Sequence, residues 1–256
     1  MSSLIHEVEA TATPDSVAAG LVHRREPSGG LVLLRSGGES SRARYSLVTA
    51  NPFLIFRSRG SRCEITRPGT GARHAQFGDP WKVLEALMPR YELLDGMDLP
   101  FPLGGCFGFW GYDLKNFTEP KLPRRALNDL ELPDCHVGFY DSVVIFDHAL
   151  GKTFVVSTGL DADGSRSGKR ANARLDFWKE ALALSVHGPQ PDPQSVFWPP
   201  KHGKKNDGRA RSNVTRQEYV EAVKRAQRFI RAGDIYQVNL SQRLTAPLLR
   251  RWPGWW

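Results

Sequence analysis

The 256-residue chain is long enough for one large domain or for one domain and part of a second, and 40% of its residues are apolar. Its formal net charge is +8, and the stretch 201–212 alone holds five basic residues against one acidic residue. That stretch has no aromatic residue and no helical spacing of its charges, which excludes a nucleic-acid groove reader and favours a solvated linker.

The first predicted elements are a helix and three strands. The helix begins after Thr13, where Pro14 suits the first turn, and its buried side should hold Val17, Leu21 and Val22. Strands are predicted at 31–34, 44–48 and 53–56, with turn residues between them. This order is typical of an antiparallel meander.

A second helix is predicted to begin at Pro80, with Asp79 as its N-cap, and to run to about Met88. In the following segment, 99–114, glycines alternate with large aromatic residues. Their spacing fits neither a dinucleotide fingerprint nor a Walker motif. We therefore expect a strand that bends and approaches a neighbouring backbone closely.

A β-hairpin is predicted from residues 142–147 and 152–157, which are rich in β-branched residues and flank a turn. His136 and His148 have no partner at metal-ligand spacing and are expected to be ordinary surface or turn histidines. A helix over 169–185 follows. Its predicted core positions are Ala173, Phe177, Ala181 and Leu184.

The stretch 215–244 predicts a capped helix followed by a strand. Thr215 and Glu218 form a capping box, and Gly233 suits the helix end. The predicted buried stripe of the helix is Tyr219, Val223, Ala226 and Ile230.

From Ile235 to Leu244 the apolar period changes to two, which predicts a strand with two different faces. The apolar face carries Tyr236, Val238 and Leu240, and the polar face carries Gln237, Asn239, Ser241 and Arg243. The polar face is either a solvated sheet face or the lining of a polar ligand cleft.

The three cysteines, Cys63, Cys106 and Cys135, are far apart and odd in number. They predict neither a disulfide framework nor a zinc site, and they indicate a reducing compartment. The N-terminus has no apolar run typical of a secretory signal, and no segment approaches the roughly 20 apolar residues that span a bilayer. A cytoplasmic protein without a membrane segment is expected.

The segment AGDIYQVNLSQR, residues 232–243, resembles the signature that opens the chorismate-binding domain of the large subunits of anthranilate synthase and aminodeoxychorismate synthase. The runs GGCFGFWGYDL and LPDCHVGFYD, at 104–114 and 132–141, also resemble the aminodeoxychorismate synthase large subunit. The resemblance implies that Gln237, Asn239, Ser241 and Arg243 line the ligand cleft.

The segment LLRSGGESSRARYSLVTANPF, residues 33–53, resembles the border of the family's tryptophan pocket. The matching positions are Ser36, Arg44, Tyr45 and Ser46. Arg35 stands where anthranilate synthases usually carry glutamate. The residues by themselves leave a second interpretation open, in which Ser36 caps a turn and Tyr45 packs in the core.

The family's magnesium-holding glutamates and its Pro-Ile-Lys-Gly-Thr and Gly-Ala-Pro-Lys segments lie beyond the region that corresponds to this chain. We therefore expect no catalytic and no metal-binding residue here, and we interpret the chain as a truncated large subunit, inactive alone. The resemblance implies an α+β fold of antiparallel sheets with packed helices. The expected domains are an N-terminal domain at 1–186, a linker at 187–212 and the opening of an incomplete chorismate-binding domain at 213–256.

The full-length enzyme implied by the resemblance aminates chorismate at C4, with Mg²⁺ as cofactor and ammonia from a glutamine amidotransferase partner. Asn239 favours this activity, because anthranilate synthases commonly have an apolar residue at that place in the motif. The enzymatic alternative is the C2 amination of anthranilate synthase. The non-enzymatic alternative is a module that binds tryptophan or a partner protein.

Overall fold

A computed structural model describes residues 3–9, 11–23, 29–37, 43–93, 98–124, 130–187 and 210–246 of the chain. Residues 188–209 and 247–256, which include most of the predicted linker and the tryptophan-rich end, lie outside the described residues. The chain divides into two compact units, Met1–Val196 and Phe197–Trp256, and each has its own internal contacts.

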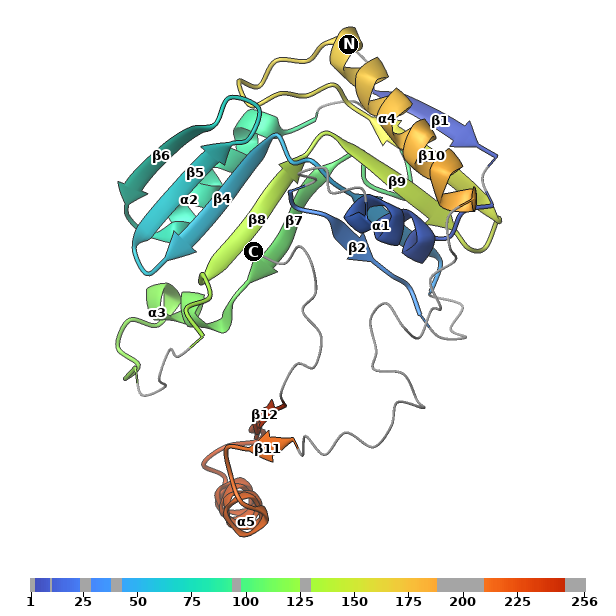
Figure 1. The fold of residues 1–256 in the computed structure, drawn as a ribbon. Coiled ribbons are helices and arrows are strands. Elements are labelled where there is room, and N and C mark those ends of the chain that lie inside the picture. The colour runs from blue at the N-terminus through green and yellow to red at the C-terminus, as the bar shows by residue number, and fades with distance from the viewer. Residues whose placement is uncertain are drawn as a thin grey trace. The chain divides into compact units, whose positions relative to one another are not determined.

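The first unit contains two five-stranded sheets, in which every described strand pair is antiparallel (Figure 1). Sheet A has the order β1-β10-β9-β3-β2 and sheet B the order β6-β5-β4-β8-β7. The strands of sheet A are β1 (Leu4–Val8), β2 (Val32–Leu34), β3 (Tyr45–Thr49), β9 (Ser142–Asp147) and β10 (Lys152–Ser157). Those of sheet B are β4 (Leu54–Arg59), β5 (Arg62–Arg67), β6 (Ala72–Phe77), β7 (Gly105–Trp110) and β8 (Cys135–Tyr140).

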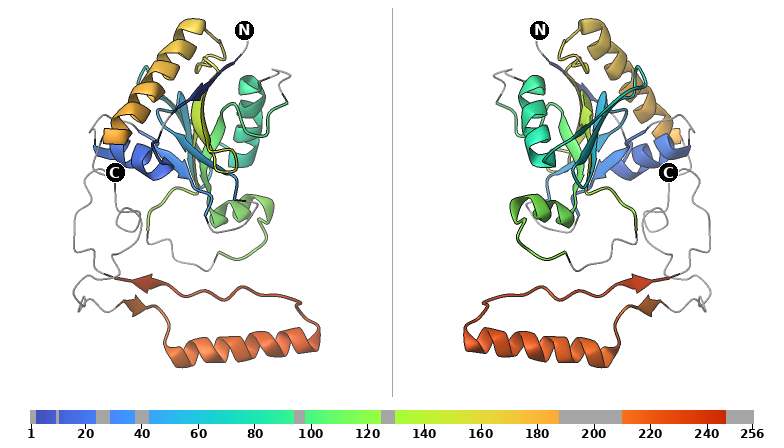
Figure 2. Two further views of the ribbon diagram at one scale, coloured as in Figure 1. Left: turned by 90° about the vertical axis from the view of Figure 1, so that its right-hand side faces the viewer. Right: turned by 90° about the vertical axis from the view of Figure 1, so that its left-hand side faces the viewer.

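Helices cover one face of each sheet, as the two views in Figure 2 show. On sheet A, α1 (Pro14–His23) and α4 (Gly168–His187) pack over Val48, Val144 and Val155. On sheet B, α2 (Pro80–Leu87) and the 3₁₀ turn η1 (Met88–Tyr91) pack over Phe56 and Val137. Two short elements, η2 (Tyr112–Leu114) and α3 (Lys115–Thr118), follow β7. The predicted α+β class, with antiparallel sheets and packed helices, is confirmed.

Two strand connections pass directly from one sheet into the other. Only Asp141 separates β8 from β9, and only residues 50–53 separate β3 from β4. Asn51 has a left-handed backbone there, with φ at 57°, which asparagine tolerates better than most residues. The Thr49 hydroxyl donates to the Ser142 carbonyl at 2.7 Å and fastens the two connections together.

The glycines of the aromatic-rich segment let β7 lie close to β8, as predicted. A Cβ on Gly108 would lie 2.1 Å from the His136 carbonyl oxygen, and one on Gly104 would lie 2.6 Å from that of Tyr140. No side chain fits at either distance. The glycines therefore serve strand packing and form no phosphate loop.

Helix α4 is confirmed, but its predicted buried face is only partly right: Ala181 is buried and Phe177 packs against the core. Ala173 is exposed and Leu184 is 49% exposed, so of the predicted positions only Ala181 is fully buried. The face is turned because the indole of Trp178 is fully buried and its Nε1 donates to Ser142 Oγ at 2.9 Å. The other buried apolar residues of the helix are Ala171, Leu175 and Leu182. On α1, Val17 and Leu21 are buried as predicted, but Val22 is 42% exposed.

The second unit consists of α5 (Arg216–Ala232) and the two-residue strands β11 (Arg211–Ser212) and β12 (Leu244–Thr245). The capping box is confirmed: Glu218 N donates to Thr215 Oγ1 at 3.2 Å, and Thr215 N donates to Glu218 Oε2 at 2.7 Å. Gly233 ends the helix with φ at 80°, the left-handed conformation that glycine accepts without a Cβ clash. The predicted buried stripe is wrong, because no residue of α5 is buried.

The strand predicted over Ile235–Leu244 is also wrong. Only its last residue, Leu244, enters a strand, and β12 pairs with β11 over two residue pairs. A strand needs a partner for its backbone N–H and C=O groups. In the described part of this unit, only Arg211 and Ser212 supply such a partner. Among the described residues, none of the helices combines the length and the apolar character needed to cross a bilayer.

Candidate functional site

The structure brings the four residues predicted for a tryptophan-like pocket together at one end of β3. The Ser36 backbone N–H donates to Ser46 Oγ at 3.0 Å, and the Ser36 hydroxyl donates to the Tyr45 carbonyl at 2.6 Å. Both bonds join the chain after β2 to β3. The Ser36 hydroxyl proton is therefore used within the protein, and its oxygen remains able to accept a hydrogen bond.

The Arg44 guanidinium is bound to Asp147. Its Nε lies 3.1 Å from both carboxylate oxygens, and its Nη2 lies 2.8 Å from Oδ2. This hydrogen bonding raises the pKa of Arg44 and lowers the pKa of Asp147. The Arg44 Cζ atom also lies 4.8 Å from the centre of the Tyr45 ring. The positive charge predicted for ligand binding is thus already paired with a carboxylate.

Tyr45 and Ser46 point to opposite sides of β3, as neighbours on a strand must. The Tyr45 ring packs edge-on against Phe101 at 6.0 Å, beside an apolar cluster that includes Ile145 and Phe154. Its hydroxyl is hidden from solvent and has no hydrogen-bond partner among the described residues. Ser46 is fully buried, and its Oγ lies 2.7 Å from His148 Nε2.

The sequence interpretation missed Asp147 and His148 at this place. Tyr45 pairs with Asp147 across β3 and β9, although the two residues lie about a hundred positions apart in the chain. The available signal was a charged residue at the end of an apolar strand, which by itself indicates only a turn. The pairing register of β3 and β9 places the Asp147 carboxylate beside Arg44, and this register cannot be deduced from the apolar and polar pattern of the sequence.

The polar residues predicted to line a cleft, Gln237, Asn239, Ser241 and Arg243, are all exposed. The Arg243 backbone N–H donates to Asn213 Oδ1 at 2.8 Å, and its carbonyl accepts from Asn213 N at 3.0 Å. Tyr236, predicted on the apolar face, is 93% exposed.

The segment between α5 and β12 lies beside the helix and borders a hollow of about 700 Å³. Ile235, Val238 and Leu240 line it from one side, with Ala226 and Phe229 of α5 on the other. Gln237, Asn239 and Ser241 are not among the lining residues. From Gln237 to Ser241 the apolar side chains thus face the hollow and the polar ones do not, as the alternating sequence predicts, although no strand forms there.

Among the described residues, no three histidine, cysteine, aspartate or glutamate side chains are grouped closely enough to hold a metal ion. Cys63, Cys106 and Cys135 are free thiols. Burial raises the pKa of Cys106 and of Cys135 to about 12, so both remain protonated near neutral pH.

Residues 42–252 match a protein family described as chorismate binding enzyme. The chain is 32% identical to anthranilate synthase component 1 of Acetivibrio thermocellus over 88% of its own length and 44% of that protein. It is 31% identical to aminodeoxychorismate synthase component 1 of Escherichia coli (strain K12), over 84% of the chain and 42% of that protein. The chain therefore spans less than half the length of these curated relatives.

The crystal structure of anthranilate synthase component I from Streptococcus pneumoniae TIGR4 has a similar fold. Its TM-score is 0.53 at 23% sequence identity, and the match covers 90% of this chain and 47% of that one. At this identity the likeness supports the fold alone. The family match begins at residue 42, so it includes Arg44, Tyr45 and Ser46 but not Ser36. It includes the whole of the 232–243 segment. The chain belongs to the chorismate binding enzyme family.

Proposed function

We propose that the protein to which this chain belongs aminates chorismate. The observation that carries the proposal is the family match over residues 42–252, which includes the segment from Ala232 to Arg243. Relatives named for two such activities, anthranilate synthase and aminodeoxychorismate synthase, match the same part of the chain. The ammonia would come from a glutamine amidotransferase subunit, as the resemblance implies.

Between the two products, we favour 4-amino-4-deoxychorismate. Asn239 supplies an amide where anthranilate synthases commonly have an apolar residue. Arg35 stands in place of their usual glutamate, and its Nη1 lies 3.3 Å from Asp15 of α1. The anthranilate product is the second candidate, because relatives of that name include the proteins of Acetivibrio thermocellus and Thermus thermophilus.

The exposed amides of Gln237 and Asn239 and the hydroxyl of Ser241 are neutral donors and acceptors. Such groups suit the carboxylates and hydroxyl of chorismate, since a binding site needs only a few well-placed polar contacts to fix orientation. The family implies Mg²⁺ as cofactor, but the described residues offer no cluster of ligands for it. No step of the reaction is therefore assigned to the metal in this chain.

A tryptophan site against Tyr45, with Ser36 and Arg44 beside it, is also proposed. Ser46 is fully buried on the other side of β3, so in this site it would support Ser36 through its Oγ and would not contact the ligand. The ring of Tyr45 and its neighbour Phe101 supply an aromatic wall, and the hidden Tyr45 hydroxyl lacks a partner among the described residues. Calorimetry with tryptophan should show weak binding that Tyr45→Ala abolishes. Tight binding that survives Ser36→Ala and Tyr45→Ala would place tryptophan elsewhere.

Chimeras test the choice of product. The matched part of the Escherichia coli aminodeoxychorismate synthase component would be replaced by this chain, and a second chimera would use the Thermus thermophilus anthranilate synthase component. Each would receive chorismate, Mg²⁺ and ammonia, with the unmodified parent enzyme as its reference. We expect the first chimera to keep at least about tenfold more of its parent's kcat/KM than the second, a difference of about 1.4 kcal/mol.

The chain alone, under the same conditions, is expected to give no product. Activity confined to the anthranilate synthase chimera would overturn the preference for C4 amination. If both chimeras fold and bind tryptophan but neither turns over chorismate, the amination proposal fails and a binding module is favoured.

A further inference from the structure

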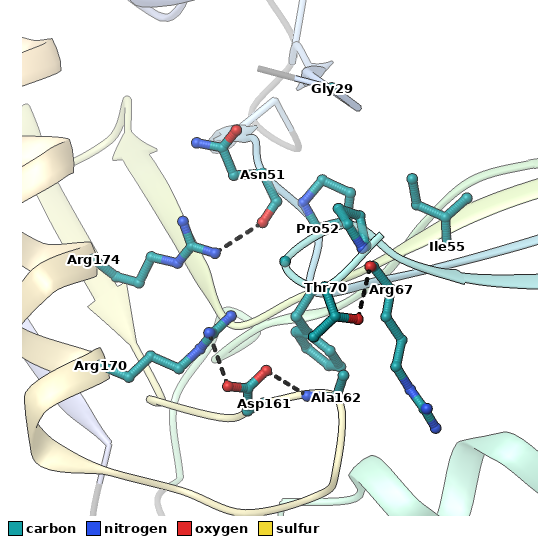
Figure 3. Close-up of a pocket in the computed structure, with 13 residues that line it drawn as sticks. Gly29, Asn51, Pro52, Ile55, Arg67, Thr70, Asp161, Ala162, Arg170 and Arg174 are labelled. Atoms are coloured by element: carbon teal, nitrogen blue, oxygen red, sulfur yellow. Dashed lines mark hydrogen bonds and ion pairs between the residues drawn. The ribbon is translucent and has the colours of Figure 1, made fainter. Parts of the chain in front are cut away.

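A cavity of about 350 Å³ lies in the first unit, where the chain passes between the two sheets (Figure 3). Arg170 and Arg174 of α4 form one wall, and Pro52 and Thr70 lie opposite them. The backbone of Asn51 and the residues Asp161 and Ala162 close it between these walls. The cavity lies at the opposite end of β3 from Tyr45. Its lining residue Asn51 is six positions after Tyr45, a length of about 20 Å if that stretch were fully extended.

The two arginines are held in place by acceptors of the fold. Arg170 Nε donates to Asp141 Oδ2 at 2.7 Å, and its Nη1 donates to Asp161 Oδ2 at 3.1 Å. Arg174 Nε lies 3.2 Å from Asp141 Oδ1, and its Nη2 donates to the Asn51 carbonyl at 3.1 Å. These bonds fix both guanidinium planes before any ligand arrives, which lowers the entropic cost of binding.

Each guanidinium keeps one nitrogen for another acceptor. Within the described residues, neither Nη2 of Arg170 nor Nη1 of Arg174 has a hydrogen-bond partner. The two side chains are 24% and 21% exposed, so water reaches them only partly. Donors in this position bind an anionic oxygen more strongly than fully solvated ones.

The lining of the cavity contains more basic than acidic side chains. Its lining includes Arg67, Arg170 and Arg174 against Asp161, and Asp141 lies buried behind the two helix arginines. Asp141 and Asp161 balance the two helix arginines, so the one positive charge in excess is that of Arg67. The cavity therefore offers an anion the unused nitrogens of Arg170 and Arg174 and no net charge of its own. Arg67 contributes its aliphatic stem to the wall, while its guanidinium points away from the other two (Figure 3).

The remaining walls are apolar, being formed by Pro52, Phe53, Ile55 and Ala162. A volume of about 350 Å³ is at the small end of ligand pockets. We propose that this cavity is a binding site for a small monocarboxylate with a single ring, whose carboxylate meets Arg170 and Arg174 and whose ring lies against Pro52 and Phe53. The proposal concerns a different site from the chorismate and tryptophan sites and does not depend on the proposed function.

Benzoate is the probe, and the complete chain is titrated by calorimetry and by amide chemical shifts. We expect saturable one-to-one binding, with the largest shifts at Asn51, Thr70 and Ala162. Benzamide, the neutral analogue of the same shape, should bind at least about tenfold more weakly because it lacks the charge that meets the arginines. Equal binding of the two probes, no saturable binding at millimolar concentrations, or shifts centred on Ser36 and Tyr45 would overturn the proposal.

Two variants and a control complete the test. Arg170→Gln leaves Arg174 to pair with Asp141 and should weaken benzoate binding about tenfold. Ala162→Leu occupies the cavity without touching an ion pair and should weaken binding similarly, which keeps the test decisive if Arg170→Gln does not fold. Arg73→Gln changes an exposed arginine on β6, outside the cavity, and should leave binding unchanged. Unaltered binding in Ala162→Leu would place benzoate elsewhere.

Discussion

Helices α4 and α5 were both predicted to bury an apolar stripe, but only α4 has buried residues. The apolar positions of α5 follow a helical period closely, and the helix is capped at both ends, yet none of its residues is buried. In α4 the apolar residues are spread around the helix, yet Trp178 and Ala171 are fully buried.

The cause lies in the neighbours of each helix. Helix α4 packs over β1, β9 and β10 and against α1, so it covers the face of a complete sheet. In the described part of the second unit, α5 has beside it only the segment that lines the 700 Å³ hollow. An amphipathic pattern thus determines that a helix forms, whereas a sheet or another helix determines which of its residues leave water.

The comparison predicts very different costs for removing an aromatic side chain from each helix. Trp178→Ala should destabilise the first unit by about 3–5 kcal/mol, because it opens a cavity and leaves the buried Ser142 hydroxyl without its donor. Phe229→Ala in α5 should change stability by about 0.5 kcal/mol or less, since that ring is 46% exposed. Urea unfolding followed by circular dichroism measures both. Comparable losses would show that the α5 stripe is packed in solution.

The first unit should also lose stability in acid through Asp147. Arg44 lowers the pKa of this carboxyl below its usual 3.8. Its stabilising effect is therefore present above about pH 4 and is lost as the pH falls through the lowered value. Asp147→Asn should cost about 1.5–3 kcal/mol at pH 7, the usual range for a hydrogen bond to a charged group.

The difference between Asp147→Asn and the unchanged protein should shrink as the pH falls below 4. Urea midpoints at pH 7, 5 and 3 test this, with Asp176→Asn, an exposed aspartate of α4, as the control. A difference that does not depend on pH would mean that the side chain stabilises by shape and not by charge.

Much of the first unit could be predicted from local pattern. The hairpin of β9 and β10 and the helix α2 begin at the predicted residues, because β-branched runs, turns and an Asp-Pro start are local signals. Strands β1 and β8 and the pair β5 and β6 were not predicted. Strand β6, Ala72–Phe77, has only one residue that is not exposed, so it lacks the alternation that identifies a half-buried strand.

The candidate sites could be predicted less completely than the strands. Ser36, Tyr45 and Ser46 lie close together in the chain, and their grouping follows from the pairing of two neighbouring strands, β2 and β3. The pairing of Arg44 with Asp147 depends on sheet register, and the cavity depends on α4 reaching the corner at Asn51 and Asp141. Such long-range contacts have no signal in a single sequence.

The smallest expected effect concerns the start of α5. Because this helix has no fully buried residue, its own end groups should contribute a large share of its stability. Thr215→Ala removes the oxygen that accepts from Glu218 N and should cost about 1 kcal/mol of local helix stability. Amide hydrogen exchange across Arg216–Ala232 should accelerate about fivefold, while β9 and β10 remain protected.

Gln217→Ala is the matched control, since it changes the same first turn without removing a capping group, and alanine favours helix. Its exchange rates should be equal to or slower than those of the unchanged protein. If Thr215→Ala has no effect on exchange, α5 must be held by contacts along its length. Its apolar stripe would then be covered in solution. Helices α4 and α5 would both be buried on one side, and they would differ only in the partner that covers them.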